Sequence, residues 1–319
     1  MTTGKAFDGA WNSTRRDFLF GVAAAGLASL AGDGCIGIAG LRRKFAMNAS
    51  TFRGYGLSLA DQVKATMSAG FAGFEPWMKD IRAAKEAGSL ADVCKAARDG
   101  GLEFVNGIAF GQWVNPDPKV RAEGLEETKR DMALLAEMGC PRVAASMFGM
   151  QKPGSPVMKL EDIAERYAVV LDLGKEMGIR PLLEYWGHSV NLTRLEDALE
   201  VLRLLNRSDA AILADVYHTY RGGGSFETYR KLSASTLPVL HMNDYPSSPA
   251  REKLVDADRV WPGDGIAPWR DVFAALDDAG ADPWLSIEVF NPNYWKTTPA
   301  ATAAEGFGKL KLTYERNRS

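Results

Sequence analysis

Four ionisable residues in the C-terminal half of the chain each stand directly after a short apolar run. Leu-Leu precedes Glu184, Leu-Ala precedes Asp215, Val-Leu precedes His241 and Leu-Ser-Ile precedes Glu288. A charged group at the end of an apolar strand cannot stay buried without a partner. Three carboxylates and one imidazole suit Mn²⁺, Mg²⁺, Co²⁺ or Zn²⁺. The pattern therefore predicts one divalent-metal site, provided that the fold brings the four side chains together.

Each of these residues, taken alone, could instead have an ordinary structural role. A single histidine is more often a structural residue than a ligand, and a carboxylate after a strand often caps a helix or pairs with a cation. All three histidines of the chain, His188, His218 and His241, lie near these strand ends. The recurrence of ionisable residues at four successive strand ends favours the metal site over four unrelated structural roles.

The elements that must position these residues alternate between short apolar runs and longer amphipathic ones. Eight strands are expected at Phe45–Thr51, Gly73–Trp77, Glu103–Phe110, Arg142–Met147, Arg180–Trp186, Ala210–His218, Leu237–Tyr245 and Trp284–Phe290. Helical periodicity is clearest over Leu59–Ala69, Ala91–Asp99, Leu125–Met138, Ile163–Met177, Leu195–Leu204 and Phe273–Ala279.

Eight strand-then-helix units predict an α/β fold of the (β/α)8 TIM barrel type, whose active sites form at the C-terminal ends of the strands. A doubly wound open sheet is the main alternative, but no Gly-x-Gly-x-x-Gly turn follows the first strand. The irregular segment Pro246–Val255 is expected to be an inserted loop over the mouth of the barrel.

The N-terminus resembles a twin-arginine export signal. Arg15 and Arg16 precede Phe-Leu-Phe and a short apolar run from Gly21 to Ala31, which is too short for a confident membrane span. An ordinary N-terminal helix is the alternative. We expect residues 1–40 to be the signal and linker, residues 41–319 to be a single barrel domain, and the protein to be exported to the periplasm by the twin-arginine machinery. Asp33 makes lipid attachment at Cys35 disfavoured.

Composition sets few further limits. Hydrophobic residues make up 46% of the chain and charged residues 24%, and the net charge of −2 offers no basic surface for nucleic acid. The three cysteines form no metal-binding or redox spacing, so they are expected to be incidental thiols. The oligomeric state stays open, a homo-oligomer included.

A longer series of residues resembles a known family. Asp215-x-x-His218, His241-x-x-Asp244 and the string Arg259-x-x-Pro-Gly-x-Gly-x-x-Pro-Trp, together with Glu184 and Glu288, are similar to the xylose isomerase-like barrel superfamily, and within it to the sugar isomerase and epimerase group typified by ketose 3-epimerases. The resemblance implies that Glu184, Asp215, His241 and Glu288 bind one divalent metal, commonly Mn²⁺. It also implies that His218 and Arg259 hold oxygens of the substrate.

The expected reaction is proton abstraction next to the carbonyl of a sugar, a keto-sugar or a glycoside, through a metal-stabilised enediolate. Glu184 and Glu288 are assigned as the two groups that remove and return the proton. Further candidates for substrate contact are Trp186, Trp113, His188 and Glu75, with Trp77 and Trp295 as additional stacking candidates; ordinary packing is the alternative for each tryptophan.

Three other functions compete with the isomerase or epimerase. A lyase or hydrolase of 3-keto-glycosides would use the same proton abstraction and expel a leaving group by β-elimination. A DNA-repair endonuclease of the superfamily would need more histidines and a basic stripe. An exported sugar-binding module would not need the complete ligand set.

Overall fold

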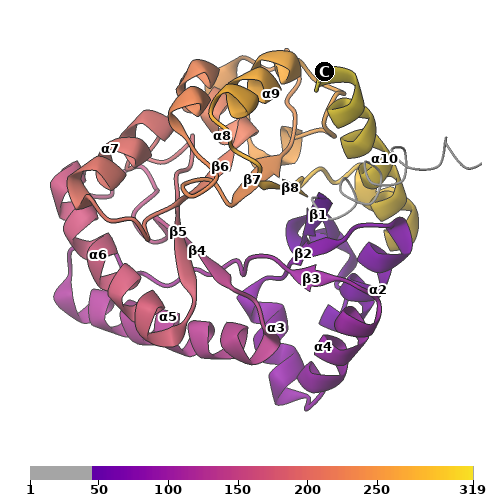
Figure 1. Ribbon diagram of the computed structural model, residues 1–319, viewed down its shortest axis with the longest axis horizontal. Helices are drawn as coiled ribbons and strands as arrows, with labels where there is room; N and C mark the ends of the chain where they lie inside the picture. Colours follow the sequence, from indigo (N-terminus) through magenta and orange to yellow (C-terminus); the bar gives the residue numbers. More distant parts are fainter. Residues whose placement is uncertain (1–44, 319) are drawn as a thin grey trace, which may run out of the picture. The chain divides into compact units, whose positions relative to one another are not determined.

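The computed structural model describes residues 45–318, and the predicted export signal and Cys35 lie outside this range. Within it, parallel strands form one sheet in the order β3-β2-β1-β8-β7-β6-β5-β4 (Figure 1). The strands are β1 (Phe45–Asn48), β2 (Gly73–Glu75), β3 (Glu103–Phe104), β4 (Arg142–Ser146), β5 (Arg180–Glu184), β6 (Ile212–Asp215), β7 (Val239–Met242) and β8 (Trp284–Ile287).

The gap between β3 and β4 is closed just beyond the end of β3. The N–H of Gly107 donates to the carbonyl of Arg142 (3.0 Å), and the N–H of Ala144 donates to the carbonyl of Gly107 (2.8 Å). Every strand therefore has a neighbour on both sides, and the predicted eight-stranded α/β barrel is confirmed.

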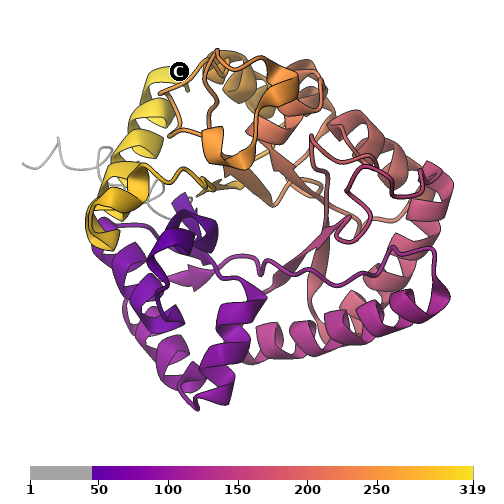
Figure 2. The ribbon, with the colours of Figure 1, turned by 180° about the vertical axis from the view of Figure 1, so that it is seen from behind.

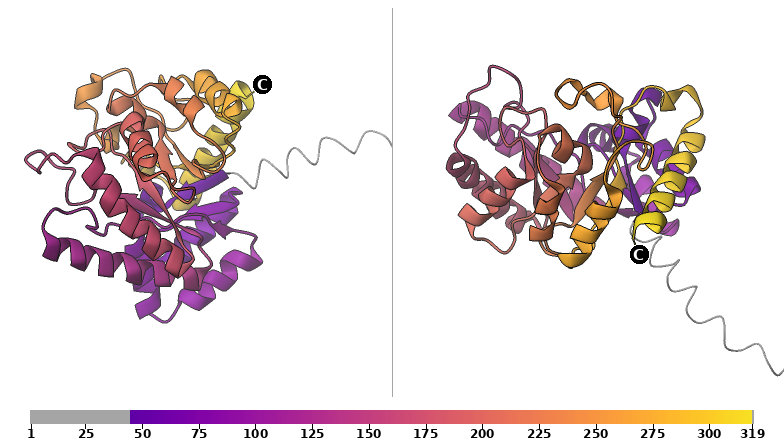
Figure 3. Two further views of the ribbon diagram at one scale, coloured as in Figure 1. Left: turned by 60° about the vertical axis from the view of Figure 1, so that its left-hand side comes forward. Right: turned by 90° about the horizontal axis from the view of Figure 1, so that it is seen from above.

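Helices surround the strands (Figures 1 and 3). The α-helices are α2 (Leu59–Ala69), α3 (Met78–Glu86), α4 (Leu90–Asp99), α5 (Pro118–Met138), α6 (Leu160–Met177), α7 (Leu195–Leu205), α8 (Val216–Arg221), α9 (Trp269–Asp278) and α10 (Pro299–Asn317). Short 3-10 turns are η1 (Ala49–Tyr55), η2 (Phe226–Lys231), η3 (Arg251–Lys253), η4 (Asp256–Asp258) and η5 (Tyr294–Lys296). None of the helices in residues 45–318 is long and apolar enough to span a bilayer.

All eight strands end earlier than the apolar runs predict, and side-chain capping explains the early end of β1 and of β6. The side chain of Asn48 accepts a hydrogen bond from the N–H of Ser50 (2.9 Å) and begins η1. The side chain of Asp215 accepts one from the N–H of His218 (2.7 Å) and begins α8. In both places a side-chain cap ends the strand and begins a helical turn, although the residues that follow also have strand propensity.

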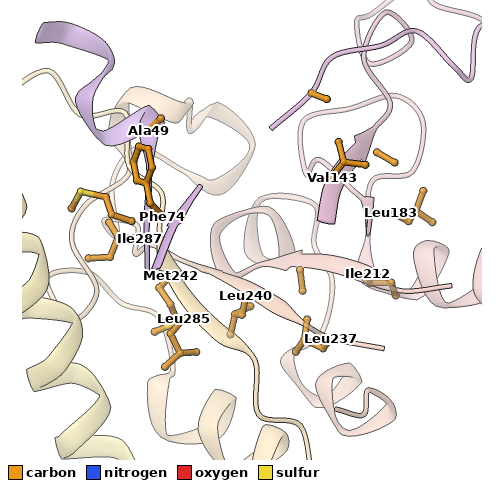
Figure 4. Packing of buried hydrophobic residues seen from close by; sticks show 14 of the residues in the cluster. Ala49, Phe74, Val143, Leu183, Ile212, Leu237, Leu240, Met242, Leu285 and Ile287 are labelled. Atoms are coloured by element: carbon orange, nitrogen blue, oxygen red, sulfur yellow. The ribbon is translucent and has the colours of Figure 1, made fainter. Parts of the chain in front are cut away.

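The alternation of side chains along each strand divides the core into an outer and an inner part. Leu240 packs outward against the helices with the residues drawn in Figure 4, whereas Leu213 and Val239 belong to a separate cluster inside the barrel. Two residues further on, Asp215 and His241 point to the same inner side and are paired in register. The inner apolar layer therefore carries a polar layer at the C-terminal ends of the strands.

The Arg-x-x-Pro-Gly-x-Gly-x-x-Pro-Trp string is a turn built around the carboxylate of Asp244. The backbone of Asp244 pairs with that of Val260 through two 2.9 Å hydrogen bonds. A Cβ at Gly265 would lie 2.3 Å from the carboxylate, so glycine is required there. The carboxylate accepts four hydrogen bonds of 2.8–3.0 Å, from the backbone N–H groups of Tyr245, Gly263 and Ala267 and from the indole of Trp269. This turn fixes the start of the string, Arg259, at the end of the barrel.

Segments that follow β4 and β7 lie in front of the strands in Figure 2. The segment after β7 holds the predicted insertion, which contains η3 and is followed directly by η4; residues 246–258 together are called the inserted loop below. The guanidinium of Arg221 on α8 donates to the backbone carbonyls of Leu254 (3.0 Å) and Glu252 (2.9 Å), which anchors the insertion to the barrel.

We expect Asp244→Asn to lower the free energy of unfolding by about 1–3 kcal/mol. The four N–H groups now donate to two carboxylate oxygens, and in the variant the amide NH₂, itself a donor, would replace one of those oxygens. Urea unfolding followed by circular dichroism measures the change. Asp264→Asn is the matched control: Asp264 pairs with Lys309 in a partly exposed ion pair, so the loss should stay below about 1 kcal/mol. Equal losses in the two variants would contradict the structural role of Asp244.

Candidate metal centre and active-site cavity

A cavity of about 380 Å³ opens at the C-terminal ends of the strands. One part of its wall is polar and the other is largely aromatic. The polar part comprises Arg53, Gln151, Glu184, His188, His218, Asp256, Arg259 and Glu288, and the apolar part comprises Trp77, Ile108, Phe110, Phe148, Trp186 and Phe290. Such a wall suits a ligand that combines hydroxyl groups with an apolar ring face.

Three of the four predicted ligands form a compact group at the base of this cavity. Nδ1 of His241 lies 3.1 Å from a carboxylate oxygen of Glu288 and 3.6 Å from one of Asp215. The ligand atoms of all three residues lie within 4.8 Å of one another. Glu184 lines the same cavity but is not part of the compact group.

The hydrogen bonding of His241 fits a cation at this position. Nε2 lies 3.1 Å from the carboxylate of Glu75, which only accepts hydrogen bonds, so Nε2 carries the proton. Nδ1 is buried, points towards two carboxylates and forms no hydrogen bond. A lone pair facing two anions is unfavourable unless a proton or a metal ion lies between them. The donor set thus matches a divalent ion held by Asp215, His241 and Glu288.

Buried charges of both signs surround this group. Burial alone would lower the pKa of His241, but the carboxylates of Glu288 and Glu75 raise it well above its usual range. Burial alone would raise the pKa of Asp215, yet His218 and Arg259 hold it well below its usual range. The permanent charge of Arg259 therefore helps to keep Asp215 ionised.

Arg259 links the metal group to the inserted loop. Its guanidinium donates to Glu288 (2.8 Å) and Asp215 (3.2 Å), and also to Asp256 in η4 (2.6 Å). It stacks over the ring of Tyr217, with 4.4 Å between the guanidinium carbon and the ring centroid. Arg259 is 1% exposed, so its charge acts without screening by bulk water.

Glu184 differs from the other carboxylates. Burial raises the pKa of Glu184 to about 8; the attraction of His241 opposes this shift and the repulsion of Glu288 adds to it. Its side chain therefore holds a proton at neutral pH in the absence of an added cation. A buried carboxyl group with a pKa near neutrality is suited to acid and base catalysis.

The two other histidines meet at the side of the cavity. Nδ1 of His218 accepts a hydrogen bond from the N–H of Gly187 (3.2 Å), and burial lowers the pKa of His218 to about 3. His188 stacks on Trp186, with ring centroids 5.8 Å apart. Ligand atoms of His188, His218 and Asp256 also lie within 4.8 Å of one another.

Two predicted substrate contacts are placed elsewhere by the structure. Trp113 is buried against Tyr167, with ring centroids 5.8 Å apart, and is not in the cavity wall. Glu75 lies behind His241, where Asn106 (2.9 Å), Asn48 (3.4 Å) and Ser286 also donate to its carboxylate. The expectation that these two residues contact the substrate directly is therefore corrected. Trp113 packs in the outer layer of the core, and Glu75 orients the imidazole of His241, a predicted metal ligand.

Trp186, His188, His218 and Arg259 do line the cavity, as does Trp77, whereas Trp295 does not. Sequence reasoning missed Asn243 and Asp256. Asn243 donates to Asp215 (2.9 Å) and to the backbone carbonyl of Glu288 (3.2 Å). The alternation of strand residues could have identified Asn243, which stands two residues after His241, whereas no periodicity marks Asp256 in its loop.

We expect Glu75→Gln to weaken divalent-metal binding about 10- to 100-fold, because the imidazole loses the carboxylate that orients it and increases its basicity. Isothermal titration of the metal-stripped protein with Mn²⁺ measures the affinity. Glu103→Gln, at the exposed start of β3, is the control and should bind as the wild type does. Unchanged affinity in Glu75→Gln would show that Glu75 has no part in the centre.

Several proteins of known activity are similar to this chain in sequence. The chain is 30% identical over 199 residues to an inosose isomerase of Bacillus subtilis, covering 61% of this chain and 69% of that protein. It is 27% identical over 269 residues to a 3-dehydroshikimate dehydratase of Pseudomonas aeruginosa, covering 82% of this chain but 40% of that protein. Relatives with these activities identify the chain as an enzyme.

Two solved structures share the fold. The IolI protein with a bound zinc atom superposes with a TM-score of 0.74 at 24% identity, covering 86% of this chain and 98% of that one. A D-psicose 3-epimerase determined with D-fructose gives a TM-score of 0.70 at 16% identity, covering 86% of this chain and 100% of that one. Residues 63–312 match the sequence model of the family described as xylose isomerase-like TIM barrel, and the protein belongs to that family.

Proposed function

We propose that this enzyme isomerises or epimerises a polyhydroxylated ketone, such as a keto-sugar or an inosose, by moving a proton at the carbon next to the carbonyl. The observation that carries the proposal is the arrangement of Glu184 and Glu288. They come from opposite neighbours of the β6–β7 pair and face one cavity, with Asp215 and His241 between them. Relatives named inosose isomerase act on a compound of this class.

We propose a divalent ion as cofactor, held by Asp215, His241 and Glu288, with Glu184 joining when its carboxyl group is ionised. Mn²⁺ is the proposed ion, and Mg²⁺, Co²⁺ and Zn²⁺ are the alternatives, Zn²⁺ being the ion in the IolI structure. When bound, it would polarise the carbonyl and stabilise the negative charge that develops on oxygen as the proton leaves.

The roles of the protein groups follow from their places in the wall. One of Glu184 and Glu288 removes the proton from the carbon, and the other returns a proton to the opposite face, which inverts the centre. The pKa of about 8 for Glu184 suits a group that donates as readily as it accepts near neutral pH. His218 and Arg259 lie in the same wall, where they can hold hydroxyl and carbonyl oxygens.

A second candidate is a dehydratase or another lyase, including one that acts on 3-keto-glycosides. It shares the first step, after which the hydroxyl or alkoxyl group on the next carbon leaves with a proton. The observation that favours it is His188 at the side of the cavity, close to Asp256, because a ring N–H there can donate a hydrogen bond to the departing oxygen away from the proton-abstracting group. The dehydratase among the relatives is consistent with this candidate.

We expect Glu184→Gln and Glu288→Gln each to lower kcat by about 10²- to 10⁴-fold, because each variant removes one of the two proton carriers. Glu123→Gln, at an exposed position on α5, is the matched control and should keep wild-type turnover. Steady-state kinetics with a panel of free ketoses, inososes and 3-keto-glycosides would identify the substrate. Full turnover by both variants would refute the two-glutamate mechanism.

Product analysis by NMR in D₂O separates the two candidates. Deuterium at the carbon next to the carbonyl, with the carbon skeleton and all hydroxyl groups intact, is the outcome for isomerisation or epimerisation. Loss of water or release of an alcohol is the outcome for a lyase and would transfer the assignment to the second candidate.

We further propose that the protein is exported by the twin-arginine route. Replacing Arg15 and Arg16 with lysine should retain the protein in the cytoplasm, because that route reads the arginine pair. Cell fractionation with immunoblotting measures the distribution. Replacing the nearby Lys5 with arginine is the control and should leave export unchanged. Periplasmic protein at the wild-type level in the double variant would contradict the proposal.

A further inference from the structure

Two cations beside Trp77, Arg53 in the wall of the active-site cavity and Lys79 in that of a smaller adjoining cavity, have no charged or hydrogen-bonding partner among residues 45–318. The guanidinium carbon of Arg53 lies 5.4 Å from the ring centroid of Trp77, and Nζ of Lys79 lies 5.3 Å from the same centroid. Both residues are exposed. Arg259, in contrast, already forms ion pairs with three carboxylates of the site. The unpaired charge of Arg53 is therefore available to a ligand in the cavity that Arg53 lines.

The backbone that presents Arg53 is fixed. A Cβ at Gly54 would lie 2.1 Å from the ring of Trp295, so the two residues are in close contact, and the indole of Trp295 donates to the carbonyl of Thr51 (3.0 Å). The hydroxyl of Tyr55 donates to the carbonyl of Tyr294 (2.8 Å). An exposed arginine on a rigid turn loses less entropy on binding than one on a mobile loop.

Trp77 is held in the same way. Its indole N–H donates to the side chain of Asn48 (3.1 Å), whose amide in turn faces Glu75 (3.4 Å), the partner of His241. A continuous set of polar contacts thus fixes the ring beneath the two cations relative to the metal group.

A smaller cavity of about 170 Å³ adjoins this place, and Arg53 and Trp77 belong to the walls of both cavities. Gln62 lines the smaller cavity, is 4% exposed, and its Oε1 has no hydrogen-bond partner, while its Nε2 donates to Asp80 (3.1 Å). An unsatisfied buried amide oxygen indicates a missing donor, such as a hydroxyl group or a water molecule.

We infer that Arg53 and Lys79 form an anion subsite that selects substrates carrying a carboxylate, with a hydroxyl group of the ligand or a bridging water at Gln62. This inference rests on the proposed function and specifies its substrate class as an acidic, polyhydroxylated ketone. The planar guanidinium matches a carboxylate with two parallel hydrogen bonds. The carboxylate of Asp80 in the same wall disfavours a doubly charged phosphate.

The test compares an anionic with an uncharged cyclic ketone, 3-dehydroshikimate and inosose, in the metal-loaded full-length protein. Arg53→Met should raise KM for 3-dehydroshikimate about 10- to 100-fold, as expected for the loss of a charge-assisted hydrogen bond, and leave that for inosose within about twofold. Lys79→Met should also raise KM for 3-dehydroshikimate, and Arg53→Lys, which keeps the positive charge, should raise it less than Arg53→Met does. Arg270→Met and Lys64→Met remove the same charges from exposed positions outside both cavities and should change neither constant.

Isothermal titration with the same two compounds keeps the test independent of the proposed reaction. Selective loss of 3-dehydroshikimate binding in Arg53→Met would support the subsite even where neither compound is turned over, in which case the proposed reaction alone fails. Equal loss for both compounds would assign Arg53 a structural role and overturn the inference. Wild-type binding that does not favour the anion would overturn it as well.

Discussion

The structure at the C-terminal ends of the barrel strands depends on one constraint, the burial of several carboxylates beside one another. Glu75, Glu184, Asp215 and Glu288 are each at most 5% exposed. Removing a single ion from water costs several kcal/mol, and like charges add their mutual repulsion. The structure offsets this with Arg259 and His241 and with amide donors such as Asn243. Nδ1 of His241, buried, without a hydrogen bond and facing two carboxylates, marks where a further cation fits.

This arrangement follows from simple features of the sequence, which explains why most of it could be predicted. Parallel strands with side chains alternating in and out bring every second residue to the barrel interior, and the strand ends meet at one edge. An ionisable residue after Leu-Leu or Val-Leu must therefore face its counterparts on neighbouring strands. Glu184, Asp215, His241 and Glu288 were identifiable for that reason, without knowledge of any loop.

Features that depend on loops or on depth within the barrel could not be predicted in the same way. Trp113 follows β3 in an irregular stretch whose course no periodicity determines, and it turns outward to Tyr167. Glu75 does face inward, but Asn106 and Ser286 saturate its carboxylate below the cavity. Asp244 stands in a motif that resembles the family pattern, yet its carboxylate binds backbone N–H groups and serves the turn rather than the substrate.

The division between core and loops also bears on the choice between isomerisation and elimination. In the proposed chemistry, both reactions begin with removal of the same proton, and the groups suited to that step, Glu184 and Glu288, belong to the barrel. The reactions differ in whether an acid reaches the next carbon's oxygen. His188 could donate a hydrogen bond to that oxygen, and its neighbour Asp256 lies in the inserted loop, in contact with Arg259. In the proposed chemistry the same barrel groups serve the first step of either reaction, and the residues near the next carbon's oxygen, His188 and the loop residue Asp256, are where the two reactions would differ.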